Sequence, residues 1–152
     1  MKILVLNGPN LNMLGQREPG IYGSQSLDFV LQHLRDHFAQ RTDAEGHPIV
    51  IEDFQSNSEG ILIDRLQQAW REGVDGVVFN AGAYTHTSIA LHDAIKSIAP
   101  IPVVEVHISN VHQREAFRHT SLIAPACRGI VCGFSLDSYR LAVEALIGAS
   151  IS

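Results

Sequence analysis

Short apolar runs rich in β-branched residues alternate along this chain with longer segments in which apolar residues recur at helical spacing. The strand-like runs are residues 3–6, 49–54, 77–79, 103–106 and 130–132, and the helical segments are residues 27–38, 61–70, 89–98 and 141–146. Alternation of this kind predicts a parallel sheet with helices on both faces. Five strands in 152 residues predict an α/β fold, a flavodoxin-like three-layer sandwich with strand order 2-1-3-4-5.

Residues that start or stop helices fit these boundaries. Ser24 or Ser26 can cap the first helical segment, Gly73 follows the second, and Pro100 follows the third. Ser135 is the expected cap of the last helix.

Composition narrows the classes of function. The net charge is -5 and the basic residues form no run, so neither nucleic acid nor an anionic membrane is an expected partner. No stretch has the length of a transmembrane helix, and the N-terminus enters a strand-like run directly, so a cytoplasmic location is expected. Cys127 and Cys132 lack metal-site spacing and are expected to be buried, reduced thiols. With no repeat or linker, residues 1–152 are expected to form one domain.

Polar residues gather where a sheet of this kind binds its ligands. Open α/β sheets bind ligands beyond the carboxyl ends of the strands, near the point where the strand order reverses. Asn10 follows the first strand-like run, Asn80 and His86 follow the third, and Glu105 and His107 end the fourth. The sequence therefore predicts a polar site at the carboxyl edge of the sheet.

The connection after the first strand is long, at roughly fifteen residues against a usual ~2–6. It is punctuated by glycines and carries Arg17 and Tyr22, which suggests an active-site lid at about residues 15–24. A phenol with a pKa near ~10 is a poor base at neutral pH, but a guanidinium held close to it would favour the tyrosinate. The pair either forms a strong base or consists of a surface arginine and an aromatic anchor for the loop.

Glu105 and His107 are two residues apart, so in a regular strand their side chains point to the same face. A carboxylate beside an imidazole fixes the tautomer of the ring, which suits a general acid, although a structural hydrogen bond is the alternative. Ser109 continues the alternation and could bind an anion. Arg114 and Arg118 would share one face of a helix, either as a solvated basic face or with Arg118 reaching a polar ligand.

Four further polar residues have both structural and functional interpretations. Asn10 and Asn80 offer neutral donors and acceptors beside the switch point, but asparagine also forms turns. His86 lies near the start of the third helix, where it could equally be a capping or solvated residue. Asp93 lies on that helix, and for one subunit alone it is expected to be a surface carboxylate.

Three long blocks of sequence match one known enzyme family. The blocks are N-G-P-N-L-N-x-L-G-x-R-E-P-x-x-Y-G over residues 7–23, N-A-G-A-Y-T-H-T-S over residues 80–88 and E-V-H-I-S-N-x-H-x-R-E-x-F-R-H over residues 105–119. The segment F-Q-S-N-S-E-G over residues 54–60 also fits. On these motifs the chain resembles the type II dehydroquinases along nearly its whole length.

The resemblance implies an enzyme that removes water from 3-dehydroquinate with neither a cofactor nor a metal. It implies that Tyr22 is the base that takes a proton α to the ketone and that Arg17 keeps this tyrosine ionised. Asn10 would hold a water molecule that stabilises the enolate intermediate. His107, oriented by Glu105, would protonate the departing hydroxyl group.

The resemblance also implies which residues hold the substrate. Ser109 and the backbone of Ile108 would bind its carboxylate. Its ring hydroxyl groups would be bound by Asn80, His86 and Arg118.

An assembly is implied as well. Asp93 would reach the active site of a neighbouring subunit in a trimer, and four trimers would form a homo-dodecamer. Ser97, one turn after Asp93, departs from the acidic residue that many family members carry, which affects a minor contact between subunits.

Other functions compatible with this fold lack their motifs. A phosphate-binding module would show a Gly-rich loop such as G-x-G-x-x-G, and a response-regulator receiver would carry acidic residues where Asn7 and Asn80 stand. A metal-dependent hydrolase would show paired histidine ligands, and a serine hydrolase would show G-x-S-x-G. A Schiff-base dehydratase needs a desolvated lysine, whereas Lys2 and Lys96 are expected to be solvated.

Overall fold

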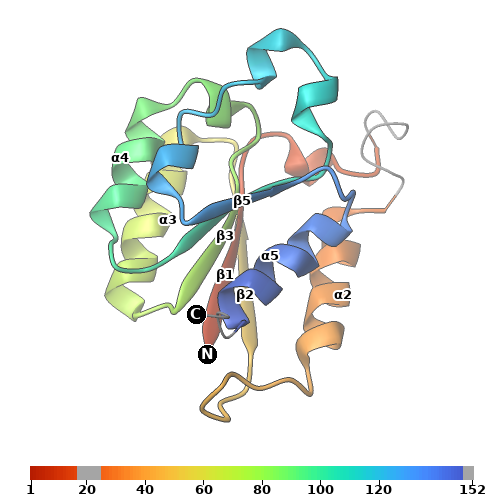
Figure 1. Ribbon diagram of the computed structural model, residues 1–152, viewed down its shortest axis with the longest axis vertical. Helices are drawn as coiled ribbons and strands as arrows, with labels where there is room; N and C mark the ends of the chain where they lie inside the picture. Colours follow the sequence, from red (N-terminus) through yellow and green to blue (C-terminus); the bar gives the residue numbers. More distant parts are fainter. Residues whose placement is uncertain (17–24, 149–152) are drawn as a thin grey trace.

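The sheet holds five parallel strands in the order β2-β1-β3-β4-β5 (Figure 1). They are β1 (Lys2–Asn7), β2 (Val50–Gln55), β3 (Gly76–Asn80), β4 (Val103–His107) and β5 (Gly129–Cys132). The computed structural model describes residues 1–16 and 25–148 of the chain. Within them the predicted strands and the predicted strand order are confirmed.

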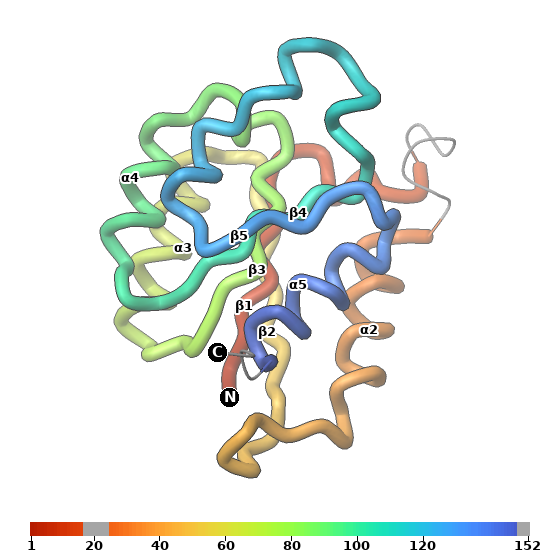
Figure 2. Tube along the Cα trace, in the orientation of Figure 1, coloured from red at the N-terminus to blue at the C-terminus, as the bar shows by residue number. Residues whose placement is uncertain are grey.

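Helices cover both faces of this sheet. The helices α2 (Leu27–Phe38) and α5 (Asp137–Ile147) lie against one face, and α3 (Glu59–Glu72) and α4 (Ile89–Ser97) lie against the other, as Figure 1 and the trace in Figure 2 show. Short 3-10 helices occupy the connections: η1 (Leu11–Met13), η2 (Gly82–His86), η3 (Val111–Gln113), η4 (Ala116–Arg118) and η5 (Ala124–Ala126). The flavodoxin-like three-layer sandwich predicted from the sequence is thereby confirmed.

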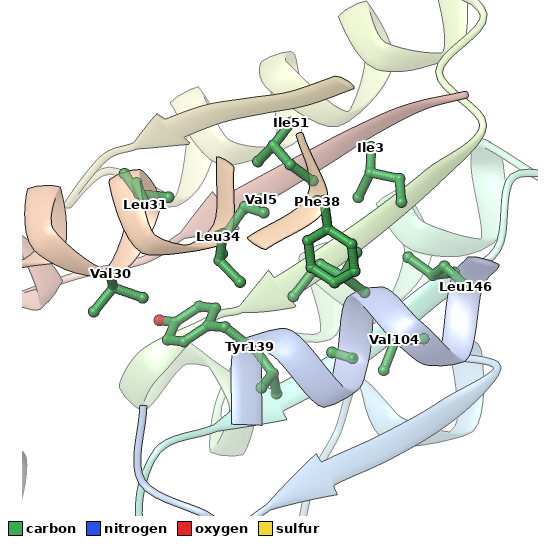
Figure 3. Packing of buried hydrophobic residues seen from close by; sticks show 14 of the residues in the cluster. Ile3, Val5, Val30, Leu31, Leu34, Phe38, Ile51, Val104, Tyr139 and Leu146 are labelled. Carbon is green, nitrogen blue, oxygen red and sulfur yellow. The ribbon is translucent and has the colours of Figure 1, made fainter. Parts of the chain in front are cut away.

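Alternation along the strands sends side chains into two separate cores. Ile3 and Val5 of β1 belong to the core shared with α2 and α5, whereas Leu4 and Leu6 belong to the core shared with α3 and α4. Figure 3 shows the first core, in which Tyr139 of α5 lies among aliphatic side chains of the sheet and of α2. Burial on both faces explains why these strands are near-continuous apolar runs.

Caps explain where two of the helices begin or end. Ser26 Oγ accepts a hydrogen bond from the N–H of Phe29, which decides between the two candidate serines at the start of α2. Gly73 follows α3 in the left-handed conformation, with φ of 71°. The prediction for Ser135 is wrong: its own φ is 56°, so the chain turns there, and the N-cap residue of α5 is Leu136, which has no polar side chain.

Three of the apolar residues that recur at helical spacing in the predicted helices are exposed to solvent. Ile61 and Trp70 lie on the outer side of α3, and Ile89 lies on the outer side of α4. Leu62 and Leu66 are fully buried, as expected. The helical period therefore predicted the helices correctly and overestimated the width of their buried faces.

Other expectations hold in part. Cys127 and Cys132 are free thiols, but they are partly rather than fully buried, because they lie beside or on the edge strand β5. The described part of the chain contains no helix with the length and apolar character of a membrane span. Of the predicted lid at about residues 15–24, residues 17–24 lie outside the described residues.

The strands β1 and β3 approach closely at their carboxyl ends. Asn7 pairs with Asn80 in the register of the sheet, and the N–H of Gly8 donates to the carbonyl of Asn80 over 2.7 Å. A Cβ atom on Gly8 would lie 2.6 Å from the carbonyl oxygen of Ala81, so only glycine fits at this position. This contact fixes the starts of the two loops that follow β1 and β3.

Candidate active site

A cavity of about 140 Å³ opens at the carboxyl ends of β1, β3 and β4. The strand order reverses between β1 and β3, so this is where a flavodoxin-like sheet is expected to bind its ligand. The lining residues are Pro9, Asn10, Leu11, Met13, Leu14, Asn80, Gly82, Ala83, His86, His107, Ile108, Ser109, Val111, Arg114 and Arg118.

Most of the predicted site residues come together in this pocket. Those that line it are Asn10, Asn80, His86, His107, Ile108, Ser109 and Arg118. Glu105 contacts His107 from within the protein and does not line the pocket. Asp93 is exposed on α4 and does not line the pocket of its own subunit, as expected for one subunit alone. Arg17 and Tyr22 lie outside the described residues.

His107 is held by a buried carboxylate. Its Nε2 lies 2.8 Å from Oε2 of Glu105, and only 2% of Glu105 is exposed. The other carboxylate oxygen, Oε1, accepts a 2.6 Å hydrogen bond from the hydroxyl of Ser121. Because an ionised carboxylate only accepts, Nε2 carries a hydrogen and Nδ1 is the ring nitrogen left for other partners. The predicted placement of Glu105 and His107 on one face of the strand is confirmed.

His86 presents a fixed tautomer to the same pocket. Its Nδ1 lies 2.8 Å from the carbonyl oxygen of Thr120, which can only accept, so Nδ1 carries a hydrogen and Nε2 of the neutral ring is an acceptor. Burial lowers the pKa of His86 below its ordinary value; the Thr120 bond opposes this shift, and repulsion from His107 and Arg118 adds to it. The neutral ring can therefore accept a hydrogen bond from the hydroxyl group of a ligand.

Two asparagines combine a turn with a place in the pocket. Asn10 is in the left-handed conformation, with φ of 70°, and its N–H donates to Oδ1 of Asn57 over 3.0 Å. Asn80 ends β3, and its Oδ1 accepts a 3.2 Å hydrogen bond from the N–H of Gly82. Both asparagines also line the cavity, so their part in a turn leaves them placed to contact a ligand.

Two guanidinium groups give the pocket a positive rim, which suits an anionic ligand. Nη1 of Arg114 lies 3.4 Å from Oγ of Ser109, and Nε of Arg118 donates to Oε2 of Glu115 over 3.2 Å. The two arginines do not share a helix, because Arg114 falls between η3 and η4. Arg114 also lines the pocket, which was not predicted, because its spacing of four from Arg118 suggested a shared helix that the chain does not form here.

A group of residues that could hold a metal ion lies away from this pocket. Asp43, Glu45 and His47 bring possible ligand atoms within 4.8 Å of one another on the loop between α2 and β2. Figure 1 shows this loop at the opposite end of the sheet from the η3 and η4 segments. Hydrogen bonds from His47 to Asp43, at 2.8 Å from the backbone and 3.1 Å from the ring, account for the cluster.

The fold and the pocket define a class of protein: an α/β enzyme with a histidine–carboxylate pair in a cavity at the switch point of a flavodoxin-like sheet. The family model described as dehydroquinase class II matches residues 1–147. The chain therefore belongs to the class II dehydroquinase family.

Individual relatives resemble the chain over nearly its full length. A 3-dehydroquinate dehydratase of Rhizobium etli is 57% identical, with 95% of this chain and 94% of the relative covered. One from Clostridium beijerinckii is 54% identical, with 96% and 95% covered. Among solved structures, the type II dehydroquinase of Butyrivibrio crossotus superposes with a TM-score of 0.92 at 44% identity, over 97% of this chain and 98% of that one.

Proposed function

We propose that this chain is a 3-dehydroquinate dehydratase, a hydro-lyase that converts 3-dehydroquinate to 3-dehydroshikimate through an enolate. The Glu105–His107 pair carries this assignment, because it supplies a positioned acid in a pocket with a positive rim. Family membership and the names of the relatives support the same reaction.

The proposed reaction has a base and an acid on separate segments. Tyr22, kept ionised by Arg17 in the predicted lid at about residues 15–24, removes the proton α to the ketone. The resulting enolate is stabilised by a water molecule that Asn10 holds. The C–O bond of the leaving hydroxyl then breaks, and His107, oriented by Glu105, gives that oxygen a proton. The products are 3-dehydroshikimate, with its new conjugated double bond, and water.

Binding of the substrate follows from the groups around the cavity. Ser109 and the backbone N–H groups near Ile108 receive the carboxylate, and the rim arginines favour its charge. The ring hydroxyl groups are received by Asn80, His86 and Arg118. The neutral Nε2 of His86 can accept a hydrogen bond, which suits a hydroxyl group that donates one.

The assembly and setting are part of the proposal. Asp93 is exposed on α4, which leaves it free to reach the active site of a neighbouring subunit in a trimer, and four trimers form a homo-dodecamer. The enzyme works in the cytoplasm and uses no cofactor, because proton transfer beside a carbonyl is chemistry that side chains can perform alone.

The test is to add 3-dehydroquinate to the assembled protein and to follow the ultraviolet absorbance of the conjugated product. We expect steady turnover that survives prolonged treatment with a chelator. We also expect no inactivation by borohydride in the presence of substrate, since no lysine imine forms. A folded, assembled protein that gives no absorbance change would overturn the proposal, and a chelator-sensitive activity would overturn its mechanism.

A further inference from the structure

The hydroxyl group of Tyr139 lies at the switch point of the sheet, between the carboxyl ends of β1 and β3. Tyr139 belongs to α5 and is fully buried, with its ring in the core that Figure 3 shows. Its hydroxyl oxygen lies 2.6 Å from Oδ1 of Asn7 and 2.9 Å from Nδ2 of Asn80. One side chain from the last helix therefore joins the two residues that end neighbouring strands.

The direction of each hydrogen bond in this chain of groups follows from one backbone donor. The N–H of Gly82 can only donate, so the atom of the Asn80 amide that faces it must be Oδ1. Nδ2 of Asn80 therefore faces Tyr139 and donates to the hydroxyl oxygen. The single hydrogen of that hydroxyl is then directed to Oδ1 of Asn7, which is the arrangement that gives this hydrogen an acceptor.

The consequence concerns the second hydrogen on Nδ2 of Asn80. An amide nitrogen carries two hydrogens, and Tyr139 takes one of them. Asn80 is only 4% exposed, yet it lines the cavity, and this second N–H is the donor of its amide that Tyr139 does not take. We infer that Tyr139 is a positioning residue, which locks the amide of Asn80 so that this N–H is presented to a ring hydroxyl of the substrate. The inference rests on the proposed function, because that function assigns Asn80 to the substrate.

Tyr139 is suited to this role and unsuited to the role of a base. Burial raises the pKa of its hydroxyl, so the group stays neutral and keeps the hydrogen that it donates to Asn7. The two asparagine amides also have their carbonyl oxygens held. Oδ1 of Asn7 accepts from this hydroxyl, and Oδ1 of Asn80 accepts from the N–H of Gly82. A rigid amide loses less conformational freedom when the substrate binds than a free one does.

The test is a double-mutant cycle with Tyr139→Phe and Asn80→Ala, in which kcat and KM for 3-dehydroquinate are measured at a temperature well below unfolding. Tyr139→Phe keeps the ring and removes only the hydroxyl. We expect Asn80→Ala to lower kcat/KM by about tenfold, and Tyr139→Phe by about threefold or more, mainly through KM, as for one neutral hydrogen bond. In the Asn80→Ala background, Tyr139→Phe should change kcat/KM by less than about twofold, because the residue it positions is gone.

Leu146→Val is the control for loss of stability. Leu146 lies on α5 in the same core as Tyr139, so shortening it loosens the packing of the helix without removing a hydrogen bond. This variant should unfold at lower urea concentration and keep the KM of the wild type. Should Tyr139→Phe not fold, Asn7→Ala serves in its place, since it removes the acceptor that directs the hydroxyl hydrogen, and it should likewise raise KM.

Each outcome of the cycle decides the inference. Wild-type KM in Tyr139→Phe, or effects of the two substitutions that multiply, would show a purely structural tyrosine and overturn it, while leaving the role of Asn80 intact. If Asn80→Ala itself keeps wild-type kcat/KM, the assignment of Asn80 to the substrate fails, and the inference fails with it. Absence of turnover in the wild type would instead overturn the proposed function.

Discussion

Nε2 of His107 lies 2.8 Å from Oε2 of Glu105, and both residues are buried at the end of β4. This contact orients the imidazole and leaves Nδ1 as the nitrogen that can carry a proton to a ligand, as the proposed role of His107 requires. Oε1 of the same carboxylate is held by Ser121 at 2.6 Å. The three residues form one chain of hydrogen bonds. Loss of the Ser121 hydroxyl or of the Glu105 charge should therefore change how the imidazole is oriented.

Replacement of Glu105 by glutamine should lower kcat by about a hundredfold, because the amide keeps the shape of the carboxylate but loses its charge and can select the wrong tautomer. The absorbance assay measures this loss. Glu45→Gln, on the exposed loop between α2 and β2, is the matched control and should keep the wild-type rate. A fully active Glu105→Gln would mean that the carboxylate does not orient the acid.

Ser121→Ala should lower kcat by about three- to tenfold. The substitution removes one hydrogen bond to the carboxylate of Glu105, and Glu105 acts on the reaction only through His107. Ser121 also accepts a hydrogen bond from the N–H of Ala124, the first residue of η5, so some stability is lost as well. Ser58→Ala removes the cap of α3, where Ser58 accepts from the N–H of Ile61, and is the control for that loss. If both variants show the same kcat, the hydroxyl of Ser121 contributes to stability alone.

Active sites completed across subunits can be tested by mixing two inactive proteins. Asp93→Asn and His107→Gln chains are co-expressed, each with its own affinity tag, and mixed assemblies are purified on both tags. These assemblies should have about a quarter of wild-type activity, because a random quarter of the sites combine an intact His107 with an intact Asp93 from the neighbouring subunit. The same two proteins mixed after assembly are the control and should stay nearly inactive. Mixed assemblies that gain nothing would place Asp93 outside the neighbouring site.

Cys127 should be unusually slow to alkylate in the folded protein. Burial raises the pKa of its thiol from 9.0 to about 12, with the charge of Glu105 adding to the effect, so the thiolate is scarce at any pH below that value. A shift of this size lowers the thiolate fraction at pH 8 by about a thousandfold, and we expect at least a hundredfold slower reaction with iodoacetamide than in urea. Mass spectrometry of the Cys127 peptide measures the rate, and a rate equal to that of the unfolded chain would contradict the expected burial.

The fold could be predicted from local patterns because each pattern has a local physical cause. The apolar runs of β1 and β3 are continuous since both faces of the sheet are covered, and the period of α2 with its Ser26 cap fixes where that helix begins. The placement of Glu105 and His107 follows from the alternation of a strand. These relationships need no knowledge of distant parts of the chain.

The parts that could not be predicted depend on long-range contacts or on other subunits. Tyr139 reaches Asn7 across 132 positions of sequence, so no spacing indicates the contact. Ser121, in the loop after η4, donates to Glu105 across 16 positions of sequence. Trp70 looks like a core residue by its period, yet it is 55% exposed, since the face of α3 that meets the sheet is narrower than the apolar stripe.

In the proposed reaction, a tyrosine base and a histidine acid act on separate steps. These two roles can be tested by following 3-dehydroquinate in deuterated water by NMR, together with product absorbance, for the wild type, Tyr22→Phe and His107→Gln. We predict that Tyr22→Phe gives neither product nor deuterium at the carbon α to the ketone beyond the rate without enzyme. We predict that His107→Gln incorporates deuterium at the same carbon while forming product at least about a hundredfold more slowly than the wild type. Proton removal does not need the acid, whereas departure of the hydroxyl group does. Product formation by either variant within about tenfold of the wild-type rate would contradict the proposed roles of Tyr22 and His107.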